Sequence, residues 1–467
     1  MNNILVDLSR WQFAITIASH MTFPAITVGM SVFLVMMYGS YLRTRKEIYL
    51  AIYRFWLRIF AVGFALGVVM GIVMTFQFGL NWSGYSMAVG PILAVMLGME
   101  VITAFFLEAG FLGIMLYGQG RVSDRVMFFA ICMVSLGAIL STTWIMSANS
   151  WMQTPAGYEI VNGQFQPTDW VAAIFNPSFS VRFWHMLLAV LLSAALIITG
   201  TGAWYLLKKK YQEFARRTFS MGLVAISILI PIQIWMGDTV AKVIAPFQPP
   251  KLEAIEGNWA STNTGWNVLV IPDQANQRNL LEISIPCMGS VFDFDDWSCT
   301  TTVPGLSQTS RDMQPPMVFA FYGFRIMFFS ACLMYFAAAA SILLRLRGEL
   351  YTARWFHRLL VAAIPVGVVA VIAGWVVAET GRQPFVVYGL LRTANSVSPI
   401  QPAEVAASLA LFLVIYGTLL SIYVGYFIRV VRSGPQEVDT TVSSRTPDSP
   451  GALVPDADLL ADRRARL

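Results

Sequence analysis

Long apolar blocks, separated by short polar segments, run through almost the whole chain. Each block holds about 20 residues nearly free of charge, the length that an α-helix needs to cross the roughly 30 Å hydrocarbon core of a bilayer. The pattern therefore predicts an all-α polytopic membrane protein with nine transmembrane helices. The predicted spans are 12–41, 54–79, 93–118, 126–149, 183–207, 219–240, 317–344, 357–378 and 404–430.

Basic residues gather in alternate loops between these blocks. Because cytoplasmic loops carry an excess of lysine and arginine, we predict that the basic loops face the cytoplasm. The opposite loops, such as 80–92 and 150–182, contain almost no basic residues. The N-terminus is therefore expected outside and, with nine spans, the C-terminus inside. The basic residues behind this orientation are Arg43, Arg45, Lys46, Arg121, Arg125, Lys208, Lys209, Lys210, Arg216, Arg217, Arg345, Arg347, Arg354 and Arg358.

The composition removes several other classes of protein. Hydrophobic residues make up 57% of the chain and charged residues only 12%, against about 25% charged residues in typical soluble domains. The net charge of +5 comes from the loop clusters, so we exclude nucleic acid as a partner. The four cysteines form no CxxC or CxxCH motif, which argues against a zinc ribbon, a thioredoxin-like site and covalently bound c-type haem. The start, MNNILVDLSRW, lacks a basic leader, so we interpret the first block as a span and not a cleaved signal.

One predicted outer loop, 241–316, is long and polar and has proline-rich edges. Loops longer than about 15 residues are usually functional or disordered. Cys287 and Cys299 both lie in it, on the oxidising side of the membrane, so we predict a disulfide, with two free thiols as the alternative. The chain thus divides into six spans (1–240), the loop (241–316), three spans (317–432) and a disordered cytoplasmic tail (433–467).

Ionisable residues inside the spans are candidates for function, because a charge near the bilayer centre costs about 2.5–3.5 kcal/mol on insertion scales. Glu100 and Glu108 lie in the third span. In a regular helix their separation is about 12 Å along the axis and about 80° around it. Two carboxylates on one side of a helix suit a stepwise proton relay. The alternative is two neutral, buried carboxyl groups that fill packing defects.

Histidine and methionine in the spans indicate possible haem ligation. His20 and His185 lie within spans, and imidazole and thioether groups are common axial ligands of haem iron. A single membrane histidine is about as often a packing residue as a ligand. Met327 lies two residues after Arg325, whose charge would need an anion such as a haem propionate. The third histidine, His357, is predicted to be a solvated boundary residue.

The eighth span ends in a polar group next to Trp375, formed by Glu379, Arg382 and Gln383. On the predicted topology, the candidate haem residues all lie in the outward halves of their helices, whereas Glu108 lies closer to the cytoplasm. This arrangement suits the delivery of cytoplasmic protons to an oxygen-reducing centre. In the second span, Gly63, Gly67 and Gly71 form a small-residue ridge, which we interpret as a helix-packing surface.

The candidate residues described above, taken together with the short sequence segments around them and in their order along the chain, resemble subunit I of the bacterial cytochrome bd-type quinol oxidases. The resemblance runs from LSRWQFAIT to the ninth span. The matching segments are RWQFAIT with His20, FQFGLNW, Glu100 with FFLE ending at Glu108, SANSWMQTP, FWH at His185, KLEAIEGNW, FRIM and GWVVAETGRQP.

The resemblance implies a terminal quinol:oxygen oxidoreductase of the translocase class. Such an enzyme oxidises quinol at the outer side, passes electrons through haems and reduces O2 to water with cytoplasmic protons. It generates a proton motive force without pumping. The resemblance also implies a bacterial cytoplasmic membrane location, a subunit II partner in a heterodimer, and single-helix small subunits.

The resemblance also implies roles for individual residues. His185 and Met327 would be the axial ligands of low-spin haem b558, with Arg325 beside its propionates. Lys251 and Glu256, in KLEAIE, would act in quinol oxidation, on a Q-loop that resembles the short form.

The two high-spin haems would take the remaining residues. Glu379 matches the ligand of haem b595, with Trp375 between haems, and His20 matches a ligand of the oxygen-site haem with Glu100 on its other side. Arg10 and Arg382 would bind cofactor, and Glu108 would carry protons. Ser141 and Asn149 fall where polar residues line routes to the haems. Thr75 stands where many relatives have glutamate, so the oxygen-site group is either haem d or a further haem b.

Two other functions compete with this one. A haem-free secondary transporter would use Glu100, Glu108 and Arg325 to bind substrate near the midplane. Against it, the sequence shows no inverted repeat, and its polar residues lie toward one face of the membrane. A haem-binding accessory subunit without oxygen chemistry is the second alternative. The retention of both span histidines, Met327, Glu100 and Glu379 argues against that loss.

Overall fold

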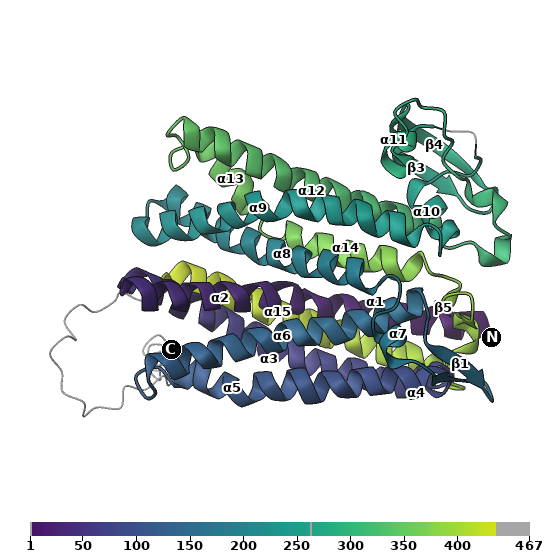
Figure 1. Ribbon diagram of the computed structural model, residues 1–467, viewed down its shortest axis with the longest axis horizontal. Coiled ribbons are helices and arrows are strands. Elements are labelled where there is room, and N and C mark those ends of the chain that lie inside the picture. The colour runs from purple at the N-terminus through teal and green to yellow at the C-terminus, as the bar shows by residue number, and fades with distance from the viewer. Residues whose placement is uncertain (1, 262–263, 436–467) are drawn as a thin grey trace, which may run out of the picture.

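The computed structural model describes residues 2–261 and 264–435 (Figure 1). Within them, nine helical stretches are long and apolar enough to cross a membrane, which confirms the predicted number. The tail predicted to be disordered lies outside the described residues from position 436 onward. The long helices are α1 Asn2–Thr22, α2 Pro24–Thr44, α3 Glu47–Leu80, α4 Ser83–Glu100, α5 Phe106–Tyr117, α6 Asp124–Gln153, α8 Phe179–Lys208, α9 Gln212–Ile244, α12 Met317–Leu346, α13 Arg354–Ala362, α14 Val366–Thr380 and α15 Pro402–Ser433.

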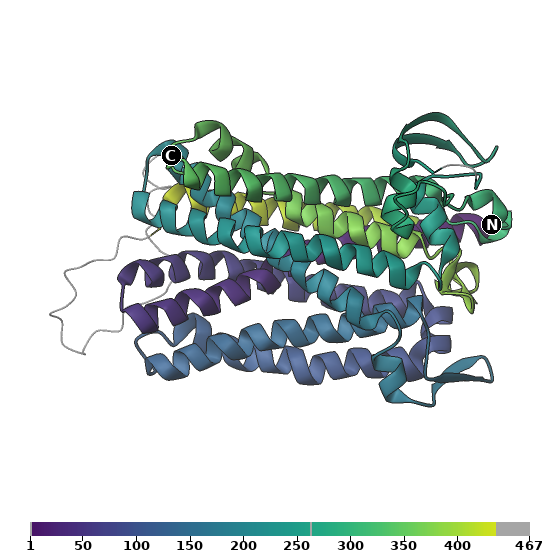
Figure 2. The ribbon, with the colours of Figure 1, turned by 45° about the horizontal axis from the view of Figure 1, so that its top comes forward.

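Short elements lie in the connections. They are the helices α7 Trp170–Ile174, α10 Pro249–Glu256 and α11 Met288–Phe294, and three antiparallel hairpins formed by β1 Tyr158–Val161 with β2 Gln164–Pro167, β3 Trp266–Asp273 with β4 Arg278–Ile285, and β5 Phe385–Val387 with β6 Leu391–Arg392. The hairpins, α10 and α11 gather at the end of the bundle where the chain begins, which we call the N-terminal end (Figures 1 and 2). The connections α2–α3, α5–α6, α8–α9 and α12–α13 lie at the opposite end.

Three of the predicted spans are not single regular helices. The first is broken between α1 and α2, where Pro24 begins the second helix. The eighth is broken between α13 and α14, directly after Pro365. Proline has no backbone N–H to donate to the preceding turn, so each helix restarts there. In the third span, a π-helical turn, Val101–Phe105, separates α4 from α5.

The core of the bundle lies where the first span packs against α8. In the most apolar windows of these two stretches, 72% and 78% of the residues are buried, against 11% in α15. Gly29 of α2 lies directly on the backbone of α8, where an added Cβ would collide with the Val190 carbonyl oxygen. Small residues permit such close approach in membrane bundles. The outer helices can keep apolar side chains exposed because lipid, unlike water, accepts them.

Two details concern residues singled out in the sequence. Cys287 and Cys299 are joined by a disulfide in the long loop. The prediction that His357 is a solvated boundary residue is wrong, because its side chain is buried and its Nε2 atom lies 2.9 Å from the Leu350 carbonyl oxygen. The His357 ring also packs edge-on against Phe219 of α9, with ring centroids 5.2 Å apart, which shields it from solvent.

Candidate functional site

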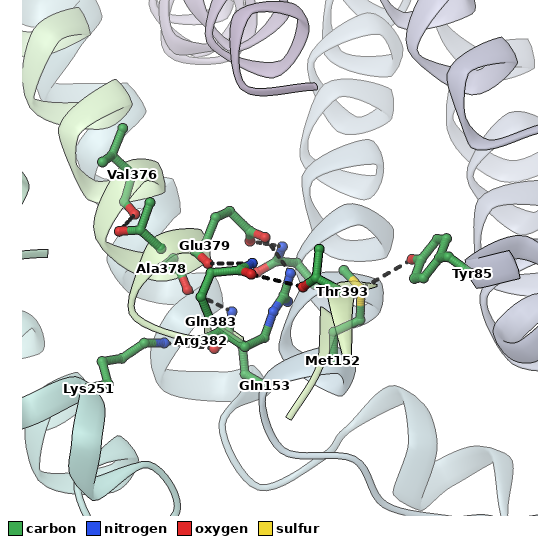
Figure 3. A network of polar contacts seen from close by, with 12 residues as sticks. Tyr85, Met152, Gln153, Lys251, Val376, Ala378, Glu379, Arg382, Gln383 and Thr393 are labelled. Atoms are coloured by element: carbon green, nitrogen blue, oxygen red, sulfur yellow. Dashed lines mark hydrogen bonds and ion pairs between the residues drawn. The ribbon is translucent and has the colours of Figure 1, made fainter. Parts of the chain in front are cut away.

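A buried group of charged side chains lies at the N-terminal end of the bundle, where α6, α8, α10 and α14 meet (Figure 3). Arg382 forms an ion pair with Glu379 near the end of α14. Asn149 of α6 donates a hydrogen bond to Glu379 Oε1 (2.7 Å) and accepts one from Arg182 of α8 (2.5 Å). Lys251 of α10 approaches from the other side. We call these five residues the cationic cluster.

Positive charge exceeds negative charge in this cluster, as far as the structure describes the chain. Arg182, Lys251 and Arg382 are all at least 93% buried and share one carboxylate, Glu379. Several of their donors have no hydrogen-bond partner among the described residues: Arg182 Nη1, Arg382 Nε and Arg382 Nη1. Unpaired charged donors are costly when buried. The cluster is therefore suited to hold an anion with several acceptor oxygens.

Lys251 belongs to the cationic cluster and not to the immediate surroundings of Glu256, although both lie on α10. Its Nζ atom donates a hydrogen bond to Gln153 Oε1 (2.7 Å), and Gln153 in turn donates to the Ala378 carbonyl oxygen (3.1 Å). Burial, together with the charges of Arg182 and Arg382, holds the pKa of Lys251 well below its usual value. The two ends of α10 therefore contact different polar groups: Lys251 contacts the cationic cluster and Glu256 contacts Arg325.

A cavity of about 470 Å³ opens beside the cluster, between α1, α3, α4, α6 and α14. Glu379, Arg382 and Trp375 line it, and so does Arg10, which also pairs with Asp7 (3.7 Å). Residues close to two other candidates, His20 and Glu100, also line this cavity. Met21 lies next to His20 on α1, and Leu97 lies one turn before Glu100 on α4.

His20 faces α3, and its Nδ1 atom is shielded without a hydrogen-bond partner in the described part of the chain. The small-residue ridge predicted for helix packing does pack α3 against its neighbours, since Gly63 lies against Thr27 and Gly67 against Phe23. Gly71 has a further effect. A Cβ atom there would lie 3.1 Å from His20 Cε1, so the glycine leaves room for the imidazole ring.

His185 and Met327 lie on different helices and each faces a glycine. A Cβ atom on Gly237 of α9 would lie 3.3 Å from His185 Cε1, and one on Gly374 of α14 would lie 3.3 Å from Met327 Sδ. The Gln233 amide nitrogen lies 3.3 Å from His185 Nδ1. Each candidate ligand therefore packs against a glycine of a neighbouring helix, and His185 also has the Gln233 side chain beside its ring.

The π-helical turn changes the relation between Glu100 and Glu108. It adds one residue to a turn, so the rotation between them is that of seven α-helical residues, about 20° from alignment in place of about 80°. Both then face α6. Ser141 donates a hydrogen bond to Glu100 Oε1 (2.7 Å), and Glu108 packs on Gly137, one turn away. The two carboxylates therefore lie in line along α6, Glu100 where α4 packs on it and Glu108 where α5 does.

A second buried charge pair lies where α10 meets α12. Arg325 Nη2 is 3.3 Å from Glu256 Oε2, and both side chains are almost fully buried. The guanidinium lies 4.2 Å from the Trp266 ring centroid and 4.4 Å from that of Phe321, within cation–π range. Burial raises the pKa of Glu256, and the charge of Arg325 opposes this rise. We call Arg325, Glu256, Trp266 and Phe321 the arginine cage.

Arg182, Gln153 and the alignment of the two span glutamates were not predicted from the sequence. Arg182 stands three residues before His185, but the predicted span began at residue 183, which left this arginine in a loop. A histidine flanked by an arginine one turn away was the available signal. No sequence pattern pointed to Gln153, because it is far from Lys251 along the chain and only the fold places the two side chains in contact.

The residues present fit haem groups. Most of the residues that line the cavity are apolar, and the unpaired arginine donors of the cationic cluster beside it match the propionates that a haem carries. The His20 Nδ1 atom is shielded and has no hydrogen-bond partner among the described residues. Glycines face the three candidate ligands His20, His185 and Met327, so no larger side chain crowds them from those positions. Iron in such a site would be held without covalent attachment of the porphyrin.

The nine spans, with a cation-rich polar centre buried at one end, define a polytopic membrane protein built to hold an anionic group. The family model of the cytochrome bd terminal oxidase subunit I matches residues 8–435. The chain belongs to this family. Membership implies haem cofactors and a quinol substrate, and confirms the resemblance seen in the sequence.

Individual relatives agree with this membership. The chain is 34% identical to cytochrome bd ubiquinol oxidase subunit 1 of Bacillus subtilis (strain 168), over 92% of this chain and 94% of the relative. It is 30% identical to cytochrome bd-II ubiquinol oxidase subunit 1 of Escherichia coli (strain K12), over 93% and 98%. The bd oxidase structure from Geobacillus thermodenitrificans matches with a TM-score of 0.84 at 28% identity, covering 92% of this chain and 99% of that one. The designation subunit 1 implies a second subunit in these oxidases.

Proposed function

We propose that this chain is subunit I of a terminal oxidase that oxidises quinol at the outer side of the membrane and reduces O2 to water with cytoplasmic protons. Charge separation then arises from proton release on one side and uptake on the other, without a pump. The observation that carries this proposal is the surplus of buried positive charge beside the cavity at Glu379. A protein that binds no anionic cofactor would gain nothing from these unpaired arginines.

Bound haems would supply one-electron transfer and oxygen binding. His185 and Met327 would hold the low-spin haem b558. Glu379 would hold the high-spin haem b595, and His20 with Glu100 would hold the oxygen-site group, either haem d or a further haem b. The glycines opposite His20, His185 and Met327 support these roles, because each removes a side chain that would compete for space.

Arg182, Arg382 and Arg10 would bind propionates. Arg182 and Arg382 are fixed by Asn149 and Glu379, so their free donors keep a defined direction. Trp375 borders the same cavity with a shielded Nε1 atom that has no partner within the described ranges. A donor set held in place before the anion arrives needs little reorganisation on binding.

Glu108 and Glu100 would move protons toward the oxygen site. Their alignment by the π-helical turn supports this role, because both face the same stripe of α6. Ser141 holds the Glu100 carboxylate in place by its hydrogen bond. Glu108 lies toward the end of the bundle that carries the basic loops, from which cytoplasmic protons would enter.

Quinol would be oxidised beside α10, at the arginine cage. Glu256 would accept a proton from a quinol hydroxyl group, and its raised pKa brings it nearer to the operating pH. Lys251 would act from the cationic cluster at the other end of α10, where its position supports a link between the quinol site and the haem propionates.

The orientation follows the positive-inside rule. The ends of α2 and α8 carry Arg43 and Lys208, and both lie at the end of the bundle opposite the N-terminus. We infer that this end faces the cytoplasm of a bacterial cell, with the long loop outside. Subunit II, and small single-helix subunits, would cover lipid-facing helices of this chain.

Haem analysis of the purified complex tests the proposal. Pyridine haemochrome analysis should detect b-type haem, and a red-shifted chlorin band would assign haem d to the oxygen site. Haem b alone would place the chain in a haem-b-only branch of the family. A preparation that is folded and inserted but has no Soret band would overturn the proposal and favour the haem-free transporter.

A further inference from the structure

A second carboxylate lies beside the arginine cage, on the short helix α11 of the long loop. Asp293 interacts electrostatically with both Glu256 and Arg325. Its neighbour Phe292 packs edge-on against Trp266, with ring centroids 5.6 Å apart, and Trp266 in turn faces the Arg325 guanidinium. The disulfide between Cys287 and Cys299 closes the segment that contains α11. The fold therefore holds Asp293 next to the cage.

The two oxygens of Asp293 have different surroundings. Oδ2 is shielded and has no hydrogen-bond partner among the residues that the structure describes. The residue as a whole is only half-buried, so Asp293 is not sealed from the surface of the loop. Glu256, by contrast, is 2% exposed and is held by Arg325. Asp293 thus lies beside the sealed charge pair and is the more exposed of the two carboxylic residues.

The charges around Asp293 favour proton binding. Glu256 and Arg325 neutralise each other, so an ionised Asp293 adds an unbalanced negative charge at a desolvated position. Burial, and then the negative charge of Glu256, raise the pKa of Asp293 to about 8, while Arg325 acts in the opposite direction. A group with a pKa near the operating pH both accepts and releases protons readily.

We propose that Asp293 is a proton-relaying residue of the quinol site, which takes a proton released to Glu256 and passes it to the outer aqueous phase. The inference rests on the proposed function. Oxidation of one quinol breaks two O–H bonds and yields quinone, two protons and two electrons. The two electrons would pass to the haem that His185 and Met327 would hold. Both protons must leave the site, and Glu256 is 2% exposed whereas Asp293 is only half-buried.

Other charged groups near α11 are already engaged. On α9, Lys242 pairs with Asp238 (3.0 Å) and with Asp295 (2.7 Å), at exposed positions. Asp296 accepts hydrogen bonds from Ser298 and Thr301, which lower its pKa. Among the described residues, the titratable and charged groups that act on Asp293 are therefore Glu256 from α10 and Arg325 from α12.

The test is the pH dependence of quinol oxidation in the purified complex with its haems. In the unaltered protein, turnover should rise with pH through a midpoint near 8, as Asp293 loses its proton. Asp293→Asn should lower turnover by roughly a hundred-fold, the low end of general acid–base effects, and should remove this ionisation from the profile. Reduction of the haems by dithionite, which bypasses quinol, should be unchanged.

Two further variants separate proton transfer from packing. Asp295→Asn removes a charge two residues away, at an exposed position. Asparagine tolerates the left-handed backbone conformation found there. This variant should leave both the turnover and its pH profile unchanged. Asp293→Glu keeps a carboxyl group and should restore most of the rate. A glutamate variant as slow as the asparagine variant would overturn the proposal, because the loss would then come from packing.

Failure of this inference and failure of the proposed function give different results. If the unaltered complex oxidises quinol and Asp293→Asn does so at the same rate with the same pH profile, the relay is wrong and the proposed function stands. If the unaltered, haem-loaded complex oxidises none of the ubiquinols and menaquinols supplied, the proposed function itself fails, and the relay fails with it.

Discussion

Replacement of Gly71 by alanine tests the assignment of His20 as a haem ligand. The added Cβ atom would lie 3.1 Å from His20 Cε1, whereas ordinary contacts of this kind are 3.4–4 Å. The imidazole must therefore shift by a few tenths of an ångström. A coordinated imidazole cannot make this shift freely, because metal–ligand distances tolerate changes of only about 0.2 Å.

The expected loss follows from the cost of overpacking. Inserting a methyl group into a well-packed site typically costs about 1–3 kcal/mol, which corresponds to roughly a 5- to 150-fold weaker hold on the haem. Helix propensity acts in the opposite direction, since alanine is favoured over glycine in a helix by about 1 kcal/mol. A loss of haem would therefore not come from a weaker α3.

The assay is the haem content of the purified complex, resolved by type with pyridine haemochrome analysis and reduced-minus-oxidised spectra. Gly71→Ala should lose the oxygen-site haem and keep the low-spin signal. Gly79→Ala on the same helix is the matched control. Among the described residues, no atom lies within 4 Å of the Cβ atom that this substitution adds. The control variant should therefore keep every haem. Full haem content and full oxygen affinity in Gly71→Ala would refute the placement of His20 at an iron.

Three more predictions address the remaining roles. His185→Ala should remove the low-spin haem signal from a chain that still inserts, and an unchanged dithionite-reduced spectrum would contradict the ligand assignment. Glu256→Gln should lower quinol turnover by about a hundred-fold or more while sparing the haems. In the unaltered protein turnover should fall as pH drops below the raised pKa of Glu256. Normal turnover in the variant would exclude the proton-accepting role. Glu108→Gln should slow oxygen reduction in stopped-flow traces more than haem reduction, and equal slowing of both steps would count against a proton relay.

The number of spans was predictable because each apolar block has the length that a bilayer requires. The breaks at Pro24 and Pro365 had a visible signal in the sequence, but hydropathy windows average over single residues. The π-helical turn had none, because VITAF is as compatible with α-helix as with π-helix. Its effect on Glu100 and Glu108 became visible only through their shared contact with α6.

Candidate residues were predictable where spacing along one helix brings them together. Glu379 and Arg382 lie one turn apart, and their pairing follows from helical geometry. Contacts between distant segments were not predictable in this way. Asp293 is separated from Arg325 by part of the loop and from Glu256 by the β3–β4 hairpin, so no local pattern links the three. Arg182 needed the correct start of α8 before its relation to His185 could be seen.

The most direct test of the central claim is the spectrum of the purified complex after anaerobic addition of quinol, followed by admission of oxygen. The account predicts that quinol reduces the haems, with low-spin and high-spin b-type features, and that oxygen then reoxidises them with formation of water. Haems that stay oxidised with every quinol supplied, or that stay reduced in the presence of oxygen, would contradict it.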